Sequence, residues 1–466
     1  MNADTEAVWL DEGHITASLD AHKVEDAALV AETLAKAEEL HGLNADDAAA
    51  LLAVKDPELR DRIFHAAARV KERIYGKRVV LFAPLYFSSL CSNECLYCAF
   101  RSRNTEVRRR ALSMEEIDAE TRILLRQGHK RLLLVAGEAY PGSGIDYVLD
   151  TIDTVYAARE NDASIRRVNV NIAATTVENY RKLKEAGIGT YILFQETYHK
   201  ESYEKLHPTG PKHNYAYHTE AMDRAMEGGI DDVGLGVLYG LELYRYEFAG
   251  QLMHAEHLEA VHGVGPHTIS VPRLKKADDI DPTKFDNGIS DETFAKICAL
   301  IRIAVPYTGM IISTRESQKV REQVINLGVS QISGASRTSV GGYAEEERPT
   351  DTEQFDVSDQ RSLDEVVRWL MENGHIPSFC TACYREGRTG DRFMSLCKSG
   401  QIQNCCHPNA LITLKEFLED YASAETKRVG EAMIEKELAN IPNEKTRRLT
   451  AEYIGKIAGG ERDFRF

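Results

Sequence analysis

The sequence lacks several features that define large classes of proteins. No apolar run is long enough to span a bilayer, and no basic segment followed by an apolar one at the N-terminus suggests a signal peptide. Lys and Arg number 57 against 73 Asp and Glu, a net charge of −16, which argues against general affinity for nucleic acid or anionic membranes. We therefore expect a cytoplasmic protein without nucleic-acid or membrane partners.

Cysteine is scarce, and most of it lies in two tight groups. Nine Cys in 466 residues, spaced in this way, indicate metal sites in a reducing compartment better than they indicate a disulfide framework. Cys298 lies apart from both groups in the apolar segment KICALIRIAV. We expect it to be a small buried side chain and not a metal ligand.

The first cysteine group is Cys-x3-Cys-x2-Cys within CSNECLYCAF, formed by Cys91, Cys95 and Cys98. Three thiolates can hold three irons of a 4Fe-4S cube, whereas ordinary electron carriers use four Cys for each cluster. A fourth iron without a protein ligand implies that another molecule binds there. The alternatives are a zinc site or a structural cluster with a remote fourth ligand. The spacing resembles the radical S-adenosylmethionine (SAM) superfamily, in which the amino and carboxylate groups of SAM take the open iron.

Helical and strand-like patterns alternate through the centre of the chain. Residues 20–75 carry apolar side chains at helical spacing, and strand-like runs follow, separated by helices. This alternation predicts an α/β fold, a TIM-type (β/α)8 barrel, with an open doubly wound sheet as the alternative. The count of eight strands and the resemblance favour the barrel, and the resemblance implies that it is a radical SAM barrel. The predicted strands are 77–89, 130–138, 167–174, 190–197, 231–240, 267–275, 309–316 and 329–337.

Helix boundaries and domain limits follow from local signals. Ser113-x-x-Glu116, Thr175-x-x-Glu178 and Ser362-x-x-Glu365 predict capping boxes, and Gly128 and Gly187 predict helix ends. The predicted divisions are an N-terminal helical extension (1–76), the barrel (77–340), a loop with a closing helix (341–375) and a helical C-terminal cluster domain (376–466).

The second cysteine group lies in the C-terminal part. Cys380-x2-Cys383 is followed, 22 residues later, by Cys406. A Cys-x-x-Cys pair with a distant third Cys can bind a second 4Fe-4S cluster with a free iron. A structural zinc is the alternative, since it could recruit Cys397, Cys405 or His407 as a further ligand. Adjacent Cys405 and Cys406 rarely point at one metal, so we expect only one of them to be a ligand.

Both cysteine groups and the eight-strand pattern together resemble the HydG family, tyrosine lyases that help to assemble the active-site cluster of iron-iron hydrogenase. The related thiamine-pathway tyrosine lyases resemble residues 70–340 but lack the C-terminal group. The resemblance implies Cα–Cβ cleavage of L-tyrosine to p-cresol and dehydroglycine, which yields carbon monoxide and cyanide at the second cluster. It also implies SAM, two 4Fe-4S clusters with an additional iron on the auxiliary one, cysteine on that iron, an electron donor such as ferredoxin or flavodoxin, and other hydrogenase maturation proteins as partners.

The resemblance also suggests which side chains meet SAM. Gly137 and Glu138 end a predicted strand and resemble the pair that contacts the SAM amino group. Tyr97 would lie against the adenine. Asn171 and Glu196, at strand ends, are candidate ribose or methionine contacts, or else polar residues of the barrel or of a helix cap. Arg224 is a candidate for pairing with the SAM carboxylate, and the alternative is a solvated charge on a helix.

An amino-acid substrate needs a group that binds its carboxylate. Arg315, at the end of the seventh predicted strand, suits this role because a guanidinium grips a carboxylate through two parallel hydrogen bonds. Ser313 and Thr314 would add donors, and Ser336 ends the eighth strand nearby. The alternative for Arg315 is a structural ion pair.

The barrel pattern places the two cysteine groups at opposite ends. The first follows strand one and so lies at the top face, while the helix at 362–372 would return the chain to the bottom before Cys380. His267 immediately precedes strand six and would also lie at the bottom. The resemblance makes His267 the ligand of the additional iron, with His262 as the rival.

Three functions remain in competition at this point. The first is the tyrosine lyase maturase. The second is another radical SAM enzyme, either a thiamine-type tyrosine lyase or one that uses the second cluster for sulfur donation or electron relay. The third is a non-enzymatic iron-sulfur carrier or scaffold. Reductive cleavage of SAM separates the third from the others.

Overall fold

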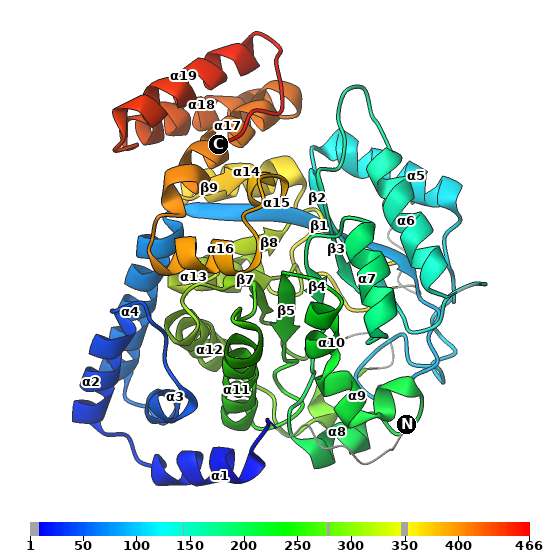
Figure 1. The fold of residues 1–466 in the computed structure, drawn as a ribbon, viewed down its shortest axis with the longest axis vertical. Helices are drawn as coiled ribbons and strands as arrows, with labels where there is room; N and C mark the ends of the chain where they lie inside the picture. The colour runs from blue at the N-terminus through cyan, green and yellow to red at the C-terminus, as the bar shows by residue number, and fades with distance from the viewer. Residues whose placement is uncertain (1–8, 143, 277–279, 346–352) are drawn as a thin grey trace.

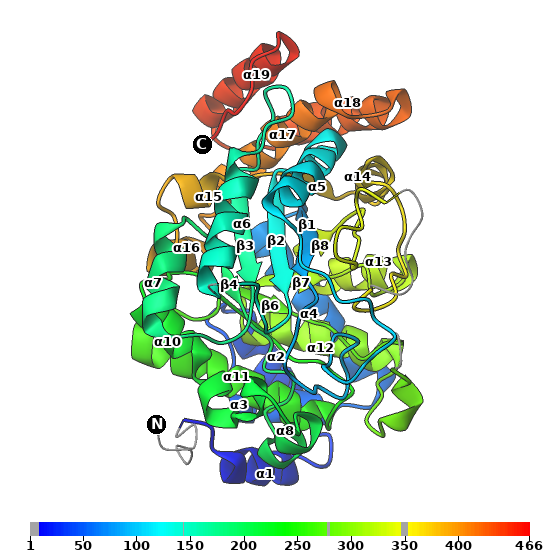
Figure 2. The same ribbon diagram turned by 90° about the vertical axis from the view of Figure 1, so that its right-hand side faces the viewer.

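The structure is a computed structural model that describes residues 9–142, 144–276, 280–345 and 353–466. A closed barrel of parallel strands forms its centre (Figure 1, Figure 2). The strands of the barrel are β1 (Arg78–Ser88), β2 (Arg131–Ala136), β3 (Arg167–Asn171), β4 (Tyr191–Ile192), β5 (Val233–Gly236), β6 (Thr268–Ser270), β7 (Gly309–Ile312) and β8 (Gln331–Ser333). They follow one another in chain order around the barrel, and β1 closes it by pairing with both β8 and β2. Closure confirms the (β/α)8 prediction and excludes the open sheet.

Helices on the outside connect each strand to the next. This is the arrangement that parallel strands require, because each crossover must return the chain to the same end of the barrel. The connecting helices are α5 (Met114–Gln127), α6 (Ile145–Ala157), α7 (Val177–Glu185), α8 (Lys200–Leu206), α9 (Tyr215–Thr219), α10 (Ala221–Glu227), α11 (Tyr244–His262), α12 (Asp291–Ala304) and α13 (Gln318–Leu327), with short 3-10 turns at Pro211–His213 and Pro282–Lys284.

Two further groups of helices flank the barrel. The N-terminal group packs on α11, α12 and α13, and the C-terminal group gathers at the opposite end of the molecule from α1 (Figure 1). The N-terminal helices are α1 (Glu12–Ala21), α2 (Ala27–Ala37), α3 (Ala45–Leu52) and α4 (Pro57–Tyr75). The C-terminal elements are α14 (Leu363–Glu372), β9 (Ile376–Ser378), α15 (Ala382–Arg385), α16 (Gly390–Lys398), α17 (Gln403–Asp420), α18 (Ala424–Ala439) and α19 (Glu444–Ala458).

Several strands are shorter than the apolar runs that predict them. The run 190–197 contains only the two-residue β4, and 267–275 contains only β6. Beyond these strands the pairing continues only as isolated parallel bridges, Glu196 with Val237 and Arg273 with Tyr239. Several of the remaining residues, such as Phe194 and Val271, line the barrel mouth. The sequence also does not predict β9, which pairs in parallel with the start of β1 through Arg78 and Ile376. This pairing attaches the C-terminal part of the chain directly to the barrel.

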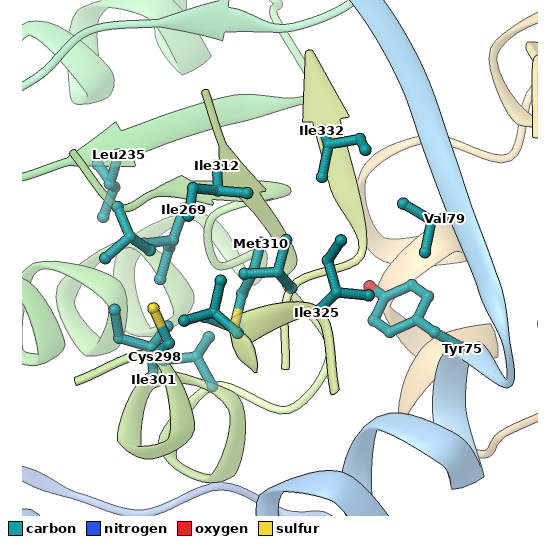
Figure 3. Close-up of a cluster of buried hydrophobic side chains, with 14 of the residues drawn as sticks. Tyr75, Val79, Leu235, Ile269, Cys298, Ile301, Met310, Ile312, Ile325 and Ile332 are labelled. Atoms are coloured by element: carbon teal, nitrogen blue, oxygen red, sulfur yellow. The ribbon is translucent and has the colours of Figure 1, made fainter. Parts of the chain in front are cut away.

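The main hydrophobic core lies between the strands and the surrounding helices. Outward-facing side chains of β5 to β8, such as Ile269 and Met310, pack against α12 and α13 (Figure 3). Cys298 of α12 is completely buried in this layer. It acts as the small apolar side chain that its sequence context predicts.

The capping signals are correct at two helices and displaced at a third. Ser113 and Ser362 form reciprocal capping boxes with Glu116 and Glu365 at the starts of α5 and α14. At α7, however, the cap is Thr176, whose hydroxyl accepts from Asn179 N, and the predicted box at Thr175 does not form. Within the described ranges, no helix is both long and apolar enough to cross a membrane.

Candidate active site and second cysteine site

A cavity of about 230 Å³ opens inside the barrel at the carboxyl ends of the strands. Catalytic residues of parallel barrels lie at this end. The first cysteine group reaches the cavity from the loop after β1. Of the residues predicted from the sequence, those that line the cavity are Cys91, Cys95, Cys98, Tyr97, Gly137, Glu138, Asn171, Glu196, Ser313, Thr314 and Arg315.

The loop that carries the three cysteines is fixed by hydrogen bonds to its own backbone. Arg109 Nη1 donates to the carbonyl oxygens of Ser89 (2.9 Å) and Phe100 (2.7 Å), and so joins the two ends of the loop. Cys98 N donates to Cys95 O at 3.0 Å, which makes a tight turn between these two ligand positions. The loop is therefore held in shape by the protein itself.

The three thiols lie on the wall of one cavity. Burial raises the pKa of Cys98 to about 11 and raises that of Cys95 further. The thiolate is the form that binds metal, so these side chains need a strong cation beside them to ionise, and bound iron supplies one. Three thiols on one cavity wall thus fit a cluster with three protein ligands.

Gly137 and Glu138, which follow β2, pack against the cysteine loop. A Cβ atom at Gly137 would lie 2.3 Å from the Leu90 carbonyl oxygen, so the close approach requires glycine. The Glu138 carboxylate accepts a hydrogen bond from Asn93 Nδ2 in the loop. Burial raises the pKa of Glu138 above its ordinary value. A carboxyl group thus sits at the cavity wall, where it can accept hydrogen bonds from an ammonium group.

Lys212 is a cation in this cavity that the sequence does not predict, with its side chain 14% exposed. Its Nζ lies 3.0 Å from Glu196 Oε1 and 5.8 Å from the centroid of the Tyr97 ring. Burial acts to lower the pKa of Lys212, but Glu196, Cys95 and Glu138 together outweigh burial and raise this pKa above its ordinary value. Glu196 has a φ of 71°, a left-handed conformation that non-glycine residues rarely adopt outside functional sites. The pair places a held positive charge next to the cysteine loop.

Arg315 approaches the cavity from the end of β7. Its guanidinium lies 3.9 Å from the centroid of the Phe355 ring, and its Nη1 donates to Arg273 O at 3.3 Å. Its Nε has no acceptor among the described residues, and burial lowers its pKa. Arg273 in turn forms a two-point ion pair with Glu316, at 2.8 and 2.6 Å. Arg315 is therefore positioned by its neighbours and keeps donor capacity for a ligand.

The second cysteine group lies at the opposite, amino end of the strands. Cys380 follows β9, Cys383 lies on α15, and Cys405 and Cys406 begin α17. Hydrogen bonds from Cys405 and Cys406 hold the pKa of the Cys383 thiol well below its ordinary value. Cys397 points elsewhere, with its Sγ 3.9 Å from Tyr75 Oη.

The thiols of this group do not converge on one point. Within the described part of the chain, no three Cys, His, Asp or Glu side chains are grouped as a single metal ion would require. The second cluster and its zinc alternative both stay predictions from the sequence.

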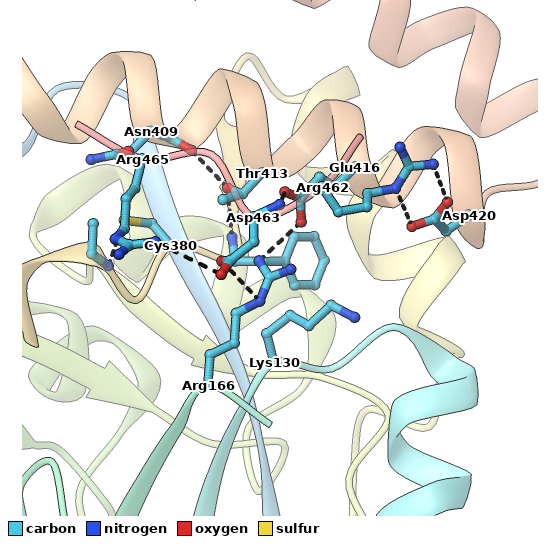
Figure 4. Close-up of polar contacts among 12 residues, drawn as sticks. Lys130, Arg166, Cys380, Asn409, Thr413, Glu416, Asp420, Arg462, Asp463 and Arg465 are labelled. Atoms are coloured by element: carbon cyan, nitrogen blue, oxygen red, sulfur yellow. Dashed lines mark hydrogen bonds and ion pairs between the residues drawn. The ribbon is translucent and has the colours of Figure 1, made fainter. Parts of the chain in front are cut away.

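The C-terminal segment closes over this end of the barrel (Figure 4). Arg166, just before β3, contacts Glu416 of α17 (2.9 Å) and Asp463 (3.3 Å). Arg385 of α15 makes a two-point ion pair with the same Asp463, at 2.6 Å for each contact. These contacts tie the last residues of the chain to the neighbourhood of Cys380.

His267 lies at this same end, beside the C-terminal part. Its Nδ1 is 3.3 Å from Asp232 Oδ1, and its ring packs 4.3 Å from that of Phe393 on α16. Although burial acts in the opposite direction, His267 and Arg167 hold the pKa of Asp232 below its ordinary value. A histidine whose one nitrogen faces a carboxylate has the arrangement typical of metal-binding imidazoles.

Comparison with known proteins identifies the family. The Radical SAM superfamily model matches residues 85–246, and the Biotin and Thiamin Synthesis associated domain matches 270–376. A 2-iminoacetate synthase of Salmonella typhimurium is 32% identical over 342 residues, 72% of this chain and 86% of that protein. The crystal structure of HydG, a maturase of the FeFe-hydrogenase, superposes with a TM-score of 0.96 at 54% identity and covers 99% of this chain and 100% of that one. The chain belongs to the HydG family.

A second HydG structure, from Carboxydothermus hydrogenoformans, is 42% identical with a TM-score of 0.80 and covers 91% of this chain and 93% of that one. The HydG-type chain is thus a radical SAM lyase, and the carrier or scaffold alternative is excluded. The family implies SAM and a 4Fe-4S cluster, which the three thiols of the upper cavity fit.

Some predicted site residues of this HydG-type chain do not lie in the cavity. Arg224, suggested for the SAM carboxylate, instead donates to Thr175 O and stacks on Tyr217, with its guanidinium 3.9 Å from the ring centroid. Ser336 is buried but does not line the cavity. His262 bonds Asp223 Oδ1 at 2.9 Å, away from the second cysteine group. The helix spacing that puts Arg224 on α10 is visible in the sequence, but the direction of its side chain is not.

Other lining residues come from segments without a motif. Gln354 and Phe355 belong to the polar stretch 338–360, which the sequence shows only as a loop. Gln354 accepts a hydrogen bond from Tyr86 of β1 at 2.7 Å. Alternation along β1 could have indicated Tyr86, because Phe82, Pro84 and Tyr86 share one face and all line the cavity.

Proposed function

We propose that this chain cleaves the Cα–Cβ bond of L-tyrosine in the upper cavity, giving p-cresol and dehydroglycine, and that carbon monoxide and cyanide form from dehydroglycine at the second cysteine site. The observation that carries the proposal is the placement of two cysteine groups at opposite ends of one closed barrel. Carbon monoxide and cyanide are small, and a closed barrel between the two sites would retain them better than an open surface.

Cys91, Cys95 and Cys98 would hold the first cluster, which together with SAM supplies a hydrogen-abstracting radical when both are bound. Glu138 would accept from the SAM ammonium group. Lys212 takes the place proposed for Arg224, because it is the cation that faces the cavity and can meet the SAM carboxylate. The role of the chain in this half of the site is to bind and orient SAM.

Arg315 would bind the tyrosine carboxylate, with Ser313 and Thr314 as further donors. The guanidinium is planar, buried and only partly satisfied by the protein, which suits a two-point contact with a carboxylate. Tyr86, Gln354 and Phe355 would enclose the rest of the substrate. Exclusion of water by these side chains protects a reactive species from side reactions.

At the other end, Cys380, Cys383 and Cys406 would hold an auxiliary 4Fe-4S cluster, and His267 an additional iron that carries cysteine. Cys405 remains the alternative to Cys406, since both contact Cys383. Other hydrogenase maturation proteins and a ferredoxin or flavodoxin as electron donor complete the proposed partners.

The test is product analysis of the anaerobically reconstituted enzyme with SAM, dithionite and L-tyrosine. The proposal expects 5′-deoxyadenosine, p-cresol and carbon monoxide. Formation of p-cresol without any carbon monoxide would favour the activity named for the 2-iminoacetate synthase relatives. Absence of p-cresol with continued SAM cleavage would point to another substrate.

A further inference from the structure

The segment that follows α8 packs edge to edge against the loop that carries the first cysteine group. Leu96 N donates to Leu206 O at 3.0 Å, and Glu94 N donates to Thr209 O at 3.1 Å. Both donors lie between cysteines of the loop, so the contact is made beside the ligand positions themselves. The shape of the cysteine loop is therefore set by this segment as well as by the loop's own hydrogen bonds.

The segment approaches the loop so closely because it contains a glycine at the point of contact. A Cβ atom at Gly210 would lie 2.4 Å from Asn93 Oδ1 and 2.7 Å from Asn93 Cα, and Gly210 has a φ of 99°. Asn93 Oδ1 also accepts from Lys212 N at 2.9 Å. Lys212, the cation proposed to meet SAM, is thus fixed to the cysteine loop through its backbone.

His207 of the same segment holds the side chain of Tyr97. Its Nε2 lies 2.7 Å from Tyr97 Oη, and its Nδ1 lies 2.7 Å from Tyr203 O. A backbone carbonyl only accepts, so Nδ1 carries the hydrogen. Burial lowers the pKa of His207 to about 3, so the ring is neutral and Nε2 is left as an acceptor. The Tyr97 hydroxyl therefore donates to His207.

Tyr97 stands between two of the cysteines and lines the cavity. Its ring meets the His207 ring edge-on, at 83° with 5.4 Å between the centroids, and Lys212 Nζ lies 5.8 Å from its centroid. The hydroxyl is the only hydrogen-bonding group of a tyrosine side chain, so the bond to His207 fixes the direction of the ring. A ring that is fixed in advance spares a ligand the cost of ordering it.

We propose that His207 is a positioning residue for SAM, because it holds the Tyr97 ring in the direction that the bound ligand requires. The inference rests on the proposed function, in which SAM binds beside the first cysteine group. His207 is completely buried and is not among the residues that line the cavity. It therefore acts through Tyr97 and not by contact with the ligand.

The experiment is a double-mutant cycle on the bond between His207 and Tyr97. The reconstituted full chain, His207→Leu, Tyr97→Phe and the variant with both substitutions are titrated with SAM in a calorimeter, and the iron content of each is measured. Each single substitution should raise the Kd for SAM about three- to tenfold, as expected for one neutral hydrogen bond. The double variant should bind no more weakly than either single variant, because both substitutions remove the same bond.

Two further variants separate positioning from packing. His207→Gln places an amide oxygen near the position of Nε2 and should recover most of the affinity lost in His207→Leu. His254 is the matched control, since it is 2% exposed, its Nδ1 lies 2.9 Å from Tyr198 Oη, and the two rings meet edge-on at 88°. Neither residue of that pair lines the cavity. His254→Leu should lower the melting temperature but keep the Kd for SAM within about twofold of the parent.

A parent chain that takes up iron but does not bind SAM would refute the proposed function itself. If the parent binds SAM, an unchanged Kd in Tyr97→Phe would overturn the inference even where His207→Leu fails to take up iron. Effects of the two single substitutions that add in the double variant would also overturn it. So would an equal loss of SAM affinity in His254→Leu.

Discussion

At the scale of single residues, Arg315 has the surroundings that define its role most sharply. Its ring contact with Phe355 and its bond to Arg273 O fix the guanidinium while donors remain free. Arg315→Ala should lower kcat/KM for tyrosine by about 10- to 150-fold, because charge-assisted hydrogen bonds contribute about 1.5–3 kcal/mol. Steady-state kinetics of p-cresol formation would measure this loss.

Arg224 offers a matched control for that substitution. It is an arginine near the same end of the barrel, but its guanidinium bonds backbone oxygens outside the cavity. Arg224→Ala should leave the KM values for both SAM and tyrosine within about twofold of the parent. A large rise in the KM for SAM would restore the role suggested by the sequence and contradict the geometry.

Lys212 leads to a second prediction at this scale. Lys212→Met would leave Glu196 buried without its partner and remove the cation from the SAM side of the cavity. We expect the Kd for SAM to rise about tenfold or more, whereas Lys212→Arg should retain more of the affinity. Calorimetric titration of the reconstituted protein would measure both. Unchanged SAM binding in Lys212→Met would show that the lysine serves only Glu196.

The sequence predicts residues well where spacing alone carries chemistry. The three cluster cysteines lie close together in the chain, and Gly137 and Glu138 are adjacent, so the members of each set need little folding information to come together. Lys212, Gln354 and Phe355 reach the cavity from distant loops without a motif, and only the closed barrel brings them together. Their absence from the predictions follows from long-range packing.

At the scale of elements, the start of α7 provides a test of local structure. Thr176 caps the helix through Asn179 N, whereas the Thr175 hydroxyl only accepts from the Asn179 side chain. Thr176→Ala should lower the free energy of unfolding by about 1 kcal/mol, within the range measured for lost N-caps. Thr175→Ala should cost less. Thermal unfolding of both variants gives the comparison, and a larger loss for Thr175→Ala would favour the capping box expected from the sequence.

The loop after β2 makes a further prediction about an element and its neighbour. A Cβ at Gly137 would meet the backbone at Leu90, so Gly137→Ala must displace the cysteine loop. We expect reduced iron in the first cluster and weakened SAM binding, with the second cluster retained. Iron analysis and electron paramagnetic resonance would test this. Normal loading of both clusters with an unchanged Kd for SAM would contradict it.

The elements were predictable in kind and order, because alternation of apolar runs with helical periods reflects the barrel directly. Their limits were less so. Runs such as 267–275 continue past the strand because residues at the barrel mouth are buried and pair only through isolated bridges, such as that of Arg273 with Tyr239. β9 escaped prediction because it has three residues and depends on pairing with the distant start of β1.

At the scale of the whole molecule, the barrel separates two cysteine groups that would serve one reaction sequence under the proposed function. Its upper end holds the cavity with the first cysteine group, and its lower end holds the second group under α17 and the C-terminal segment. Between them, inward side chains such as Arg131, Asn169 and Gln331 are polar. The two ends should therefore be separable by substitution, although they share one barrel.

The central claim is tested most directly by measuring p-cresol and carbon monoxide from the same reactions of the Cys383→Ser variant. Cys383 lies at the lower end, far from the residues that would bind tyrosine, so p-cresol should persist at a reduced rate while carbon monoxide is lost. His267→Ala should keep the second cube but lose the additional iron signal and the iron carbonyl product. Equal loss of p-cresol and carbon monoxide in a folded Cys383→Ser variant with a full first cluster would contradict the account.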